Sequence, residues 1–109
     1  VPGCPACGGI VKPDVVFFGE AVPGHRVARV ASAVERSGAL LVVGSSLMVF
    51  SGLRFVRQAA ELGTPVAIVN DGRTRGDGLA TLKLEGDCGE LLAAAAASLA
   101  EAALGEGIR

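Results

Sequence analysis

The sequence has little excess charge of either sign, a single histidine and no long apolar run. Lysine and arginine number 10 and aspartate and glutamate 11, so the 109-residue chain has a formal net charge of −1. Proteins that bind nucleic acid usually show a basic excess or patch, which is missing here. The longest apolar run, Leu91 to Ala97, is far shorter than the ~18 residues that a membrane-spanning helix needs. No signal-peptide pattern is present either. From the charge we therefore expect no nucleic-acid partner, and from the short apolar runs we expect no membrane partner.

Hydrophobic side chains and a few cysteines are what the sequence does contain. Half of the residues are hydrophobic, which supports one domain with a modest core and argues against global disorder. Three cysteines, two of them spaced as a metal-binding pair, fit a reducing compartment better than a disulfide scaffold. We therefore expect a cytoplasmic protein if the source is bacterial, or a mitochondrial one if it is eukaryotic.

A single Cys-x-x-Cys motif, Cys4 and Cys7, opens the chain. Structural zinc sites usually take two such pairs, so one pair makes half a site. A redox pair of the thioredoxin type is the second interpretation, although that motif normally follows a strand and opens a helix. An unpaired structural role is the third. Neither Cys88 nor His25 has the spacing to complete a zinc site with Cys4 and Cys7. The chain also begins at Val1 instead of Met, so we expect a further segment upstream of Val1.

Short apolar runs alternate with amphipathic stretches along the rest of the chain. Apolar residues at i, i+3, i+4 and i+7 predict a helix over Gly24–Arg36, and the run Leu40–Val43 suits a strand buried on both faces. Asp87 with Glu90 resembles a capping box before an alanine-rich helix. This alternation predicts a parallel α/β sheet with helices on its faces. The expected strands cover residues 15–18, 40–43, 66–69 and 81–85, and the expected helices cover residues 24–36, 52–62 and 87–104.

Small or polar residues follow three of the expected strands. The first turn is Gly44, Ser45 and Ser46, the second turn is Asn70, Asp71 and Gly72, and the third turn is Gly86, Asp87 and Cys88. Ligands of parallel sheets bind outside the carboxyl ends of the strands, where these turns would meet. Hydroxyls and backbone amides suit ribose and phosphate, and glycine allows close approach. Each turn alone is more simply an ordinary strand connection. Three on one edge favour a nucleotide site, although no Gly-x-Gly-x-x-Gly fingerprint is present.

Taken together, these motifs resemble the C-terminal portion of a sirtuin, an NAD-dependent protein-lysine deacylase. The resemblance spans nearly the whole chain in the family's order and is strongest toward the class II branch. The segments that carry it are Cys4–Gly9, Lys12–Glu20, Leu41–Leu47, Val69–Asn70 and the stretch from Val49 through Leu92. The resemblance implies the second half of a zinc-binding module over residues 1–14, the C-terminal part of a Rossmann-like NAD-binding domain over residues 15–104, and a tail over residues 105–109.

The resemblance also implies roles for individual residues. Cys4 and Cys7 match one ligand pair of a structural zinc ion. The residues that match NAD contacts are Gly44, Ser45, Ser46, Asn70, Asp71, Gly72 and Cys88, the last through its backbone at the adenine. Serine at position 45 replaces the more usual threonine and keeps the hydroxyl.

Four further residues match the substrate site of the family. Val16 and Phe18 correspond to the apolar wall of the acyl-lysine tunnel, and two residues apart on a strand they would share a face. Gly19 and Glu20 correspond to the loop where a substrate peptide adds as a strand. Without the resemblance, Val16 and Phe18 would be interpreted as ordinary core residues. Asp77, outside all of these motifs, is expected to be a loop charge.

The catalytic histidine of the family precedes the zinc module and has no counterpart in this chain. His25 falls at a predicted helix start and is expected to be a surface residue. In the family, the acyl group passes from lysine to ADP-ribose as nicotinamide leaves, and the histidine acts as a base. We therefore expect part of a deacylase that is inactive alone. The alternatives are a non-catalytic NAD or ADP-ribose binder, an ADP-ribosyltransferase of the same family, and a redox protein that uses Cys4 and Cys7.

Overall fold

The computed structural model describes residues 3–12, 14–16 and 20–107 of the chain. Each helix and strand predicted beyond residue 23 is present. The first predicted helix and the strand after it have the expected bounds, whereas the second helix begins two residues earlier than expected. The elements are α1 (Gly24–Arg36), β1 (Leu40–Val43), α2 (Phe50–Glu61), β2 (Val66–Asn70), the 3-10 helix η1 (Asp77–Leu79), β3 (Leu82–Glu85) and α3 (Cys88–Gly107).

The strands form one parallel sheet in the order β1–β2–β3. Leu40 lies opposite Val66 and Val43 lies opposite Val69. Each parallel pair requires a crossover, which α2 provides between β1 and β2 and the loop with η1 provides between β2 and β3. The strands therefore all end at the same edge, and the predicted parallel α/β class is confirmed.

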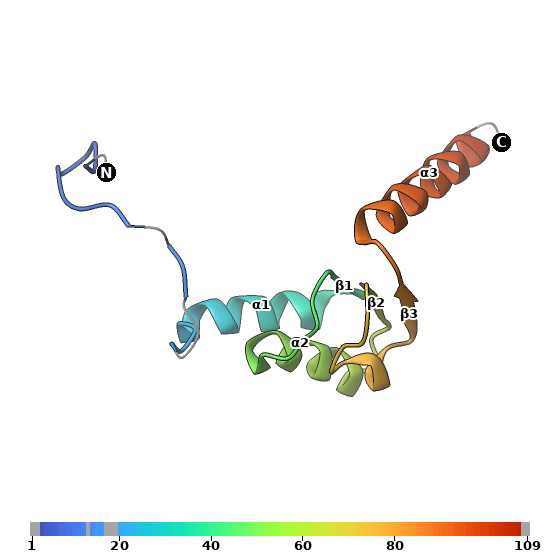
Figure 1. Cartoon of the computed structure of the whole chain (residues 1–109), viewed down its shortest axis with the longest axis horizontal. Coiled ribbons are helices and arrows are strands. Elements are labelled where there is room, and N and C mark those ends of the chain that lie inside the picture. Colours follow the sequence, from blue (N-terminus) through green and yellow to red (C-terminus); the bar gives the residue numbers. More distant parts are fainter. Residues whose placement is uncertain (1–2, 13, 17–19, 108–109) are drawn as a thin grey trace.

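The helices α1 and α2 pack together and cover one face of the sheet (Figure 1). The apolar stripe of α2 lies against β2, as its helical periodicity requires. Gln58 Nε2 donates a hydrogen bond to the Ala31 carbonyl at 2.9 Å and joins the two helices. The residues at the centre of this core are each at most 1% exposed: Leu53, Val56, Ala59, Val66 and Ile68.

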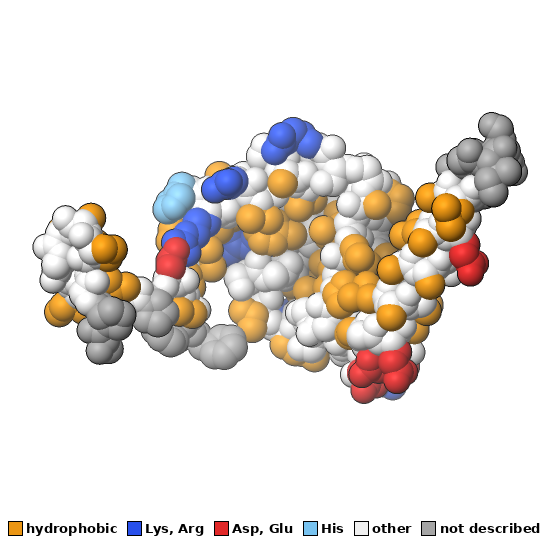
Figure 2. All heavy atoms as spheres, turned by 90° about the horizontal axis from the view of Figure 1, so that it is seen from above, with side chains coloured by type: hydrophobic (Ala, Val, Ile, Leu, Met, Phe, Trp, Pro, Cys, Tyr) orange, Lys and Arg blue, Asp and Glu red, His pale blue; other side chains and the backbone are white. Residues whose placement is uncertain are grey.

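The opposite face of the sheet is apolar and largely exposed. Leu41 is 57% exposed and Leu82 is 52% exposed, and the strand register places both on the same face as Ala67. Figure 2 shows hydrophobic side chains gathered over the part of the molecule where the strands lie. Within the described residues, it is the start of α3 that reaches this face, and the helix then leads away from the sheet (Figure 1).

The helix α3 starts at the predicted cap. The Asp87 carboxylate accepts a hydrogen bond from the Glu90 N–H at 2.9 Å, which satisfies a donor that the helix start leaves unpaired. The helix continues to Gly107, three residues beyond the expected end. None of the described helices combines the length and the hydropathy needed to cross a membrane.

The strand predicted over residues 15–18 is not observed where the structure describes it. Val15 and Val16 lie outside any strand, and Phe17 and Phe18 lie outside the described residues. A strand requires a neighbour that pairs with its backbone, and an apolar run carries no information about that neighbour. The prediction is therefore wrong for Val15 and Val16.

Candidate functional site

The three strand-end turns come together at one edge of the sheet. The Gly44 N–H donates to the Val69 carbonyl at 2.9 Å, and the Gly86 N–H donates to the Asn70 carbonyl at 3.4 Å. The Cys88 thiol lies 3.5 Å from the same Val69 carbonyl. The backbone of β2 therefore holds the turns on both sides of it, as the strand pattern predicted.

The first turn has a conformation that depends on a buried side chain. Gly44 has a φ of 68°, in the left-handed region that disfavours other residues. Leu47 also lies in that region, with a φ of 58°, and its N–H donates to Ser45 Oγ at 3.2 Å. The Leu47 side chain is only 6% exposed and belongs to the core. Burial of this leucine stabilises a backbone conformation that is otherwise unfavourable.

The helix α2 begins beside the first turn without a side-chain cap. Its N-cap residue is Val49, which makes no side-chain cap hydrogen bond, and its first turn contains no acidic residue. The first N–H groups of such a helix carry partial positive charge and favour an anion such as phosphate. A hollow of about 290 Å³ opens at this helix start and is lined by Ser45, Ser46, Leu47, Met48, Val49, Ser51 and Gly52.

The second turn is tied together at the carbonyl of Gly72. Asn70 is half-buried, and its Nδ2 donates to this carbonyl at 3.4 Å. Lys83 Nζ donates to the same oxygen at 3.0 Å. Gly72 has a φ of 113°, which another residue would adopt only with strain. The position of the Asn70 amide is therefore linked to that of a lysine on β3. Asp71, which lies between Asn70 and Gly72 in the sequence, is exposed.

Asp77 was expected to be a loop charge, and this expectation is wrong. Its carboxylate accepts from the Thr74 hydroxyl at 2.5 Å and from the Thr74 N–H at 3.1 Å, and it forms an ion pair with Lys83 at 2.9 Å. The Thr74 hydroxyl and then the Lys83 ammonium lower the pKa of Asp77 to about 2. The carboxylate is therefore charged at neutral pH.

Two sequence signals could have found this cluster. Lys83 lies between Leu82 and Leu84 in a strand where lysine is unusual, and a lysine that faces the interior needs a partner. The spacing of Thr74 and Asp77 suits a local side-chain-to-backbone turn. Neither signal identifies the other member of the pair, because the loop path between them is set by the fold.

Gly76 makes room for the buried leucine of the first turn. A Cβ at this position would come within 2.7 Å of Leu47 Cδ1 and 3.2 Å of Ile68 Cδ1. The φ of Gly76 is −93°, so alanine would be unfavourable through crowding alone. We expect Gly76→Ala to lower the free energy of unfolding by about 2 kcal/mol. Urea denaturation of the 109-residue chain, followed by circular dichroism, measures this change.

Gly78→Ala is the matched control for this substitution. A Cβ at Gly78 would meet nothing within 4 Å, so we expect a change of no more than about 0.5 kcal/mol. Equal urea midpoints for the two variants would contradict the packing role of Gly76.

Cys4 and Cys7 lie in a tight turn closed by backbone hydrogen bonds. The Gly8 N–H donates to the Cys4 carbonyl at 2.7 Å, and the Cys4 N–H donates to the Gly9 carbonyl at 2.9 Å. Backbone N–H groups of Ala6 and Cys7 lower the pKa of the Cys4 thiol, and the Cys7 side chain adds to the effect. A thiolate is the form that binds zinc. Nowhere in the described ranges do three or more His, Cys, Asp or Glu side chains gather as a metal site. Two cysteines would supply two of the four ligands that a structural zinc ion takes.

The structure describes only part of the proposed substrate site. Val16 is half-buried and Glu20 is exposed. Phe18 and Gly19 lie outside the described residues. The apolar wall that Val16 and Phe18 would share therefore stays a prediction.

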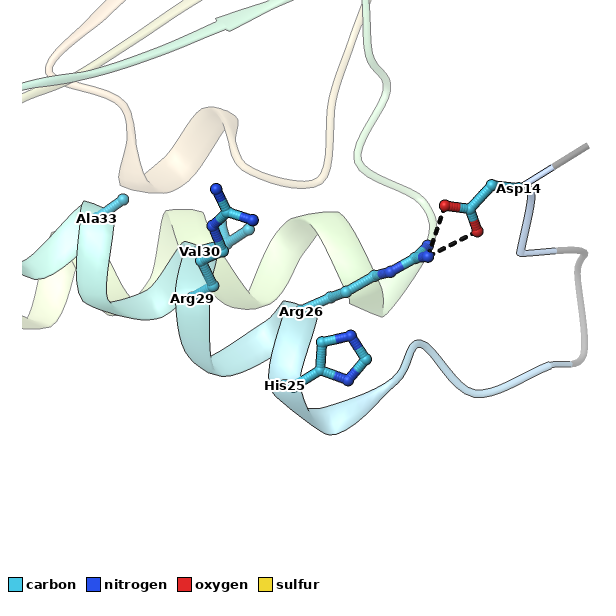
Figure 3. A pocket seen from close by; sticks show the side chains of 6 residues that line it. All are labelled: Asp14, His25, Arg26, Arg29, Val30 and Ala33. Carbon is cyan, nitrogen blue, oxygen red and sulfur yellow. Dashed lines mark hydrogen bonds and ion pairs between the residues drawn. The ribbon is translucent and has the colours of Figure 1, made fainter. Parts of the chain in front are cut away.

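His25 lies on the first turn of α1, beside a second hollow (Figure 3). Its side chain is exposed, so the expected surface position is confirmed. Arg26 Nη2 lies 2.6 Å and 2.7 Å from the two Asp14 carboxylate oxygens, and this contact lowers the pKa of Asp14. The hollow, of about 620 Å³, is lined by Asp14, His25, Arg26, Arg29, Val30 and Ala33. None of these residues belongs to the strand-end turns.

Known proteins resemble the chain in sequence over most of its length. Residues 1–51 match the Sir2 family. The NAD-dependent protein deacetylase of Bordetella pertussis (strain Tohama I) is 60% identical over 93 residues, which are 85% of this chain and 34% of that protein. NAD-dependent protein deacetylase 1 of Mycobacterium avium is 59% identical over 90 residues, which are 83% of this chain and 32% of that protein. The chain thus spans about a third of the length of these relatives.

Solved structures of Sir2 proteins resemble the chain in fold as well. A Sir2 protein bound to an acetylated peptide aligns with a TM-score of 0.70 and 34% identity, over 84% of this chain and 38% of that one. A Sir2 complex with a p53 peptide and NAD+ aligns with a TM-score of 0.69 at the same identity, again over 84% and 38%. The parallel strands and their helices match part of the sirtuin Rossmann-like fold. The sequence identity, the ordered motifs and the shared fold agree, and the chain belongs to the Sir2 family, the sirtuins.

Proposed function

We propose that this chain is part of an NAD-dependent protein-lysine deacylase and that the edge formed by its strand-end turns binds NAD. The observation that carries the proposal is the gathering of the three turns at one edge beside the uncapped start of α2. The relatives named NAD-dependent protein deacetylase support the choice of nucleotide. Because the chain spans about a third of those relatives, the activity is proposed for the assembled protein.

The residues of the edge suit the parts of NAD in different ways. Gly44 has no side chain and leaves room for a phosphate group, and the free N–H groups at the start of α2 provide a positive potential for it. Ser45 accepts a hydrogen bond from Leu47, so its own hydroxyl proton is available to a ribose or phosphate oxygen, and exposed Ser46 offers a second hydroxyl. Asn70, Asp71 and Gly72 would contact the adenosine ribose, and the backbone at Cys88 would contact the adenine.

The proposed substrate is an acylated lysine in a protein or peptide. Sir2 structures with acetylated and propionylated peptides support this class of substrate. Val16 and Phe18 would line the acyl-lysine tunnel, and Gly19 and Glu20 would pair with the peptide backbone. When NAD is bound, it supplies the ADP-ribose that accepts the acyl group as nicotinamide leaves.

The general base of the reaction is proposed to come from outside this sequence. The one histidine of the chain is His25, and it lies exposed on α1, apart from the strand-end turns. The residues of this chain would therefore bind and orient NAD and peptide, while proton transfer at the ribose depends on the rest of the protein. We expect the 109-residue chain to be inactive alone.

Cys4 and Cys7 are proposed to hold a structural zinc ion together with two further ligands. The support is the lowered pKa of the Cys4 thiol, which backbone hydrogen bonds cause, and the tight turn that holds Cys4 and Cys7 close in the chain. A zinc ion there would stabilise the module and take no part in acyl transfer. Free thiols at all three cysteines suit the reducing interior that we propose for the protein, the bacterial cytoplasm.

A chimera tests the proposed function. All 109 residues of this chain replace the matching stretch of the Bordetella pertussis deacetylase, to which they are 60% identical over 93 residues. We expect the chimera to release nicotinamide from NAD and to deacetylate an acetyl-lysine peptide, as the parent enzyme does, and the isolated chain to do neither. Peptide mass spectrometry follows the product, because deacetylation lowers the peptide mass and ADP-ribosylation raises it.

Each outcome selects among the possible functions. A folded chimera that neither binds NAD nor alters the peptide would refute the proposal. NAD binding without turnover would favour the non-catalytic module, and ADP-ribosylated peptide would favour the transferase. Turnover by the isolated chain would show that its base lies within these 109 residues.

A further inference from the structure

The loop between β2 and β3, residues 71–81, and the strand β3 that follows it contact the first and second strand-end turns. The Arg75 N–H donates to the Ser46 carbonyl at 2.9 Å, and Arg75 Nη1 donates to the Met48 carbonyl at 2.9 Å. At the side of the second turn, Lys83 Nζ donates to the Gly72 carbonyl at 3.0 Å. Arg75 therefore holds a backbone carbonyl of the first turn and another just after it, and Lys83 of β3 holds a carbonyl of the second turn.

Lys83 uses its full hydrogen-bonding capacity to hold this loop. A lysine ammonium group has three donors, and three acceptors surround this one: the Gly72 carbonyl at 3.0 Å and the Asp77 oxygens Oδ1 at 3.0 Å and Oδ2 at 2.9 Å. The side chain is 18% exposed, so its charge is poorly solvated and depends on its partners. Loss of the Asp77 charge would weaken the hold of Lys83 on Gly72.

Asp77 is in turn held by Thr74. The Thr74 side chain donates to Asp77, and its hydroxyl oxygen accepts from the Gly76 N–H at 3.2 Å. Thr74 is only 8% exposed, so water competes little for these bonds. A continuous series of hydrogen bonds therefore runs from Gly76 through Thr74, Asp77 and Lys83 to the second turn.

We propose that Asp77 and Lys83 are positioning residues for the nucleotide, because they hold the Gly72 carbonyl and, through it, the Asn70 amide in the geometry that binds the ribose. The inference rests on the proposed function and adds to it two side chains that act through the backbone of the second turn. It predicts an effect on NAD affinity that is separate from any effect on the peptide.

Asp77→Asn in the chimera tests this role. The substitution preserves shape and keeps one acceptor for Thr74, but it removes the charge that holds Lys83. We expect the KM for NAD to rise about fivefold, with kcat and the KM for peptide changed less than twofold, since one charge-assisted hydrogen bond is weakened. Lys83→Met should raise the KM for NAD similarly, and Lys83→Arg should restore part of it. Nicotinamide release at varied NAD and saturating peptide gives these constants.

Glu85→Gln is the matched control. The Glu85 carboxylate is 62% exposed and lies 3.6 Å from the same Lys83 Nζ, so this variant removes a negative charge beside the lysine without touching the Asp77 bonds. We expect its KM for NAD to be unchanged. A chimera that shows NAD-dependent turnover while Asp77→Asn behaves like Glu85→Gln would overturn the inference alone. A lower thermal midpoint of Asp77→Asn with an unchanged KM for NAD would also overturn it, because the role would then be structural only. A chimera without NAD-dependent turnover would overturn the proposed function and the inference together.

Discussion

Serine in place of Cys4 or Cys7 should remove the proposed zinc ion from the chimera. A zinc site that loses one of four thiolate ligands loses most of its affinity, and structural zinc supplies folding free energy directly. We expect about one zinc per chimera molecule before substitution and less than about a tenth of that in either variant, because a hydroxyl does not replace a thiolate. Elemental analysis by mass spectrometry after gel filtration measures the zinc, and the thermal midpoint should fall in parallel.

Cys88→Ser is the control for the zinc measurement. Cys88 lies at the start of α3, where its thiol is 3.5 Å from the Val69 carbonyl of β2, so its loss should leave zinc content unchanged. A chimera with no zinc and a reversible disulfide between Cys4 and Cys7 would contradict the metal assignment. That result would instead support the redox interpretation of the Cys-x-x-Cys motif.

Asn70→Ala should raise the KM of the chimera for NAD by about 30-fold, because the amide that we propose to bond the ribose is lost and the ribose hydroxyls would be left unpaired. The Gly72 carbonyl would also lose the bond from Asn70 Nδ2, so the second turn becomes less ordered. The KM for the acetyl-lysine peptide should stay within twofold. Steady-state kinetics with each substrate varied in turn separates the two effects.

Gln58→Ala is the matched amide deletion away from the edge. Gln58 Nε2 bonds the Ala31 carbonyl between α2 and α1 at 2.9 Å, so its loss removes one amide hydrogen bond from the helix layer. We expect a lower thermal midpoint for this variant and an unchanged KM for NAD. Equal NAD constants for Asn70→Ala and the unsubstituted chimera would contradict the assignment of Asn70 to the nucleotide.

Local periodicity was enough to predict most of the secondary structure. The apolar spacing between Gly24 and Gly38 gave α1 with the observed bounds, and the unbroken run Leu40–Val43 gave β1. The start of α2 was missed by two residues, because its N-cap is Val49 and carries no polar capping signal. The strand predicted at Val15 failed because pairing requires a partner strand that the run itself does not specify.

The sequence also predicts one part of the candidate site and not another. The three turns were predicted to meet because parallel strands end at one edge, and the register of β1 and β3 on β2 confirms that they do. The sequence alone does not predict the Thr74, Asp77 and Lys83 cluster, because by its pattern Asp77 is a loop charge. Which carboxylate reaches Lys83 depends on the path of the loop around η1, and that path follows from packing of the whole molecule.

The sequence by itself determined the family, the order of helices and strands, and the edge where the turns gather. These depend on local periodicity and on motifs that can be recognised without knowledge of the structure. Tertiary structure decided how the turns are held. Burial of Leu47 against Gly76 sets the backbone of the first turn, and the Asp77–Lys83 ion pair sets the Gly72 carbonyl of the second. Both depend on contacts between segments that approach each other only in the folded chain. In a close-packed region that excludes water, the absence of a Cβ at Gly76 decides whether Leu47 fits, and the pairing of Asp77 with Lys83 decides whether the lysine charge is stabilised.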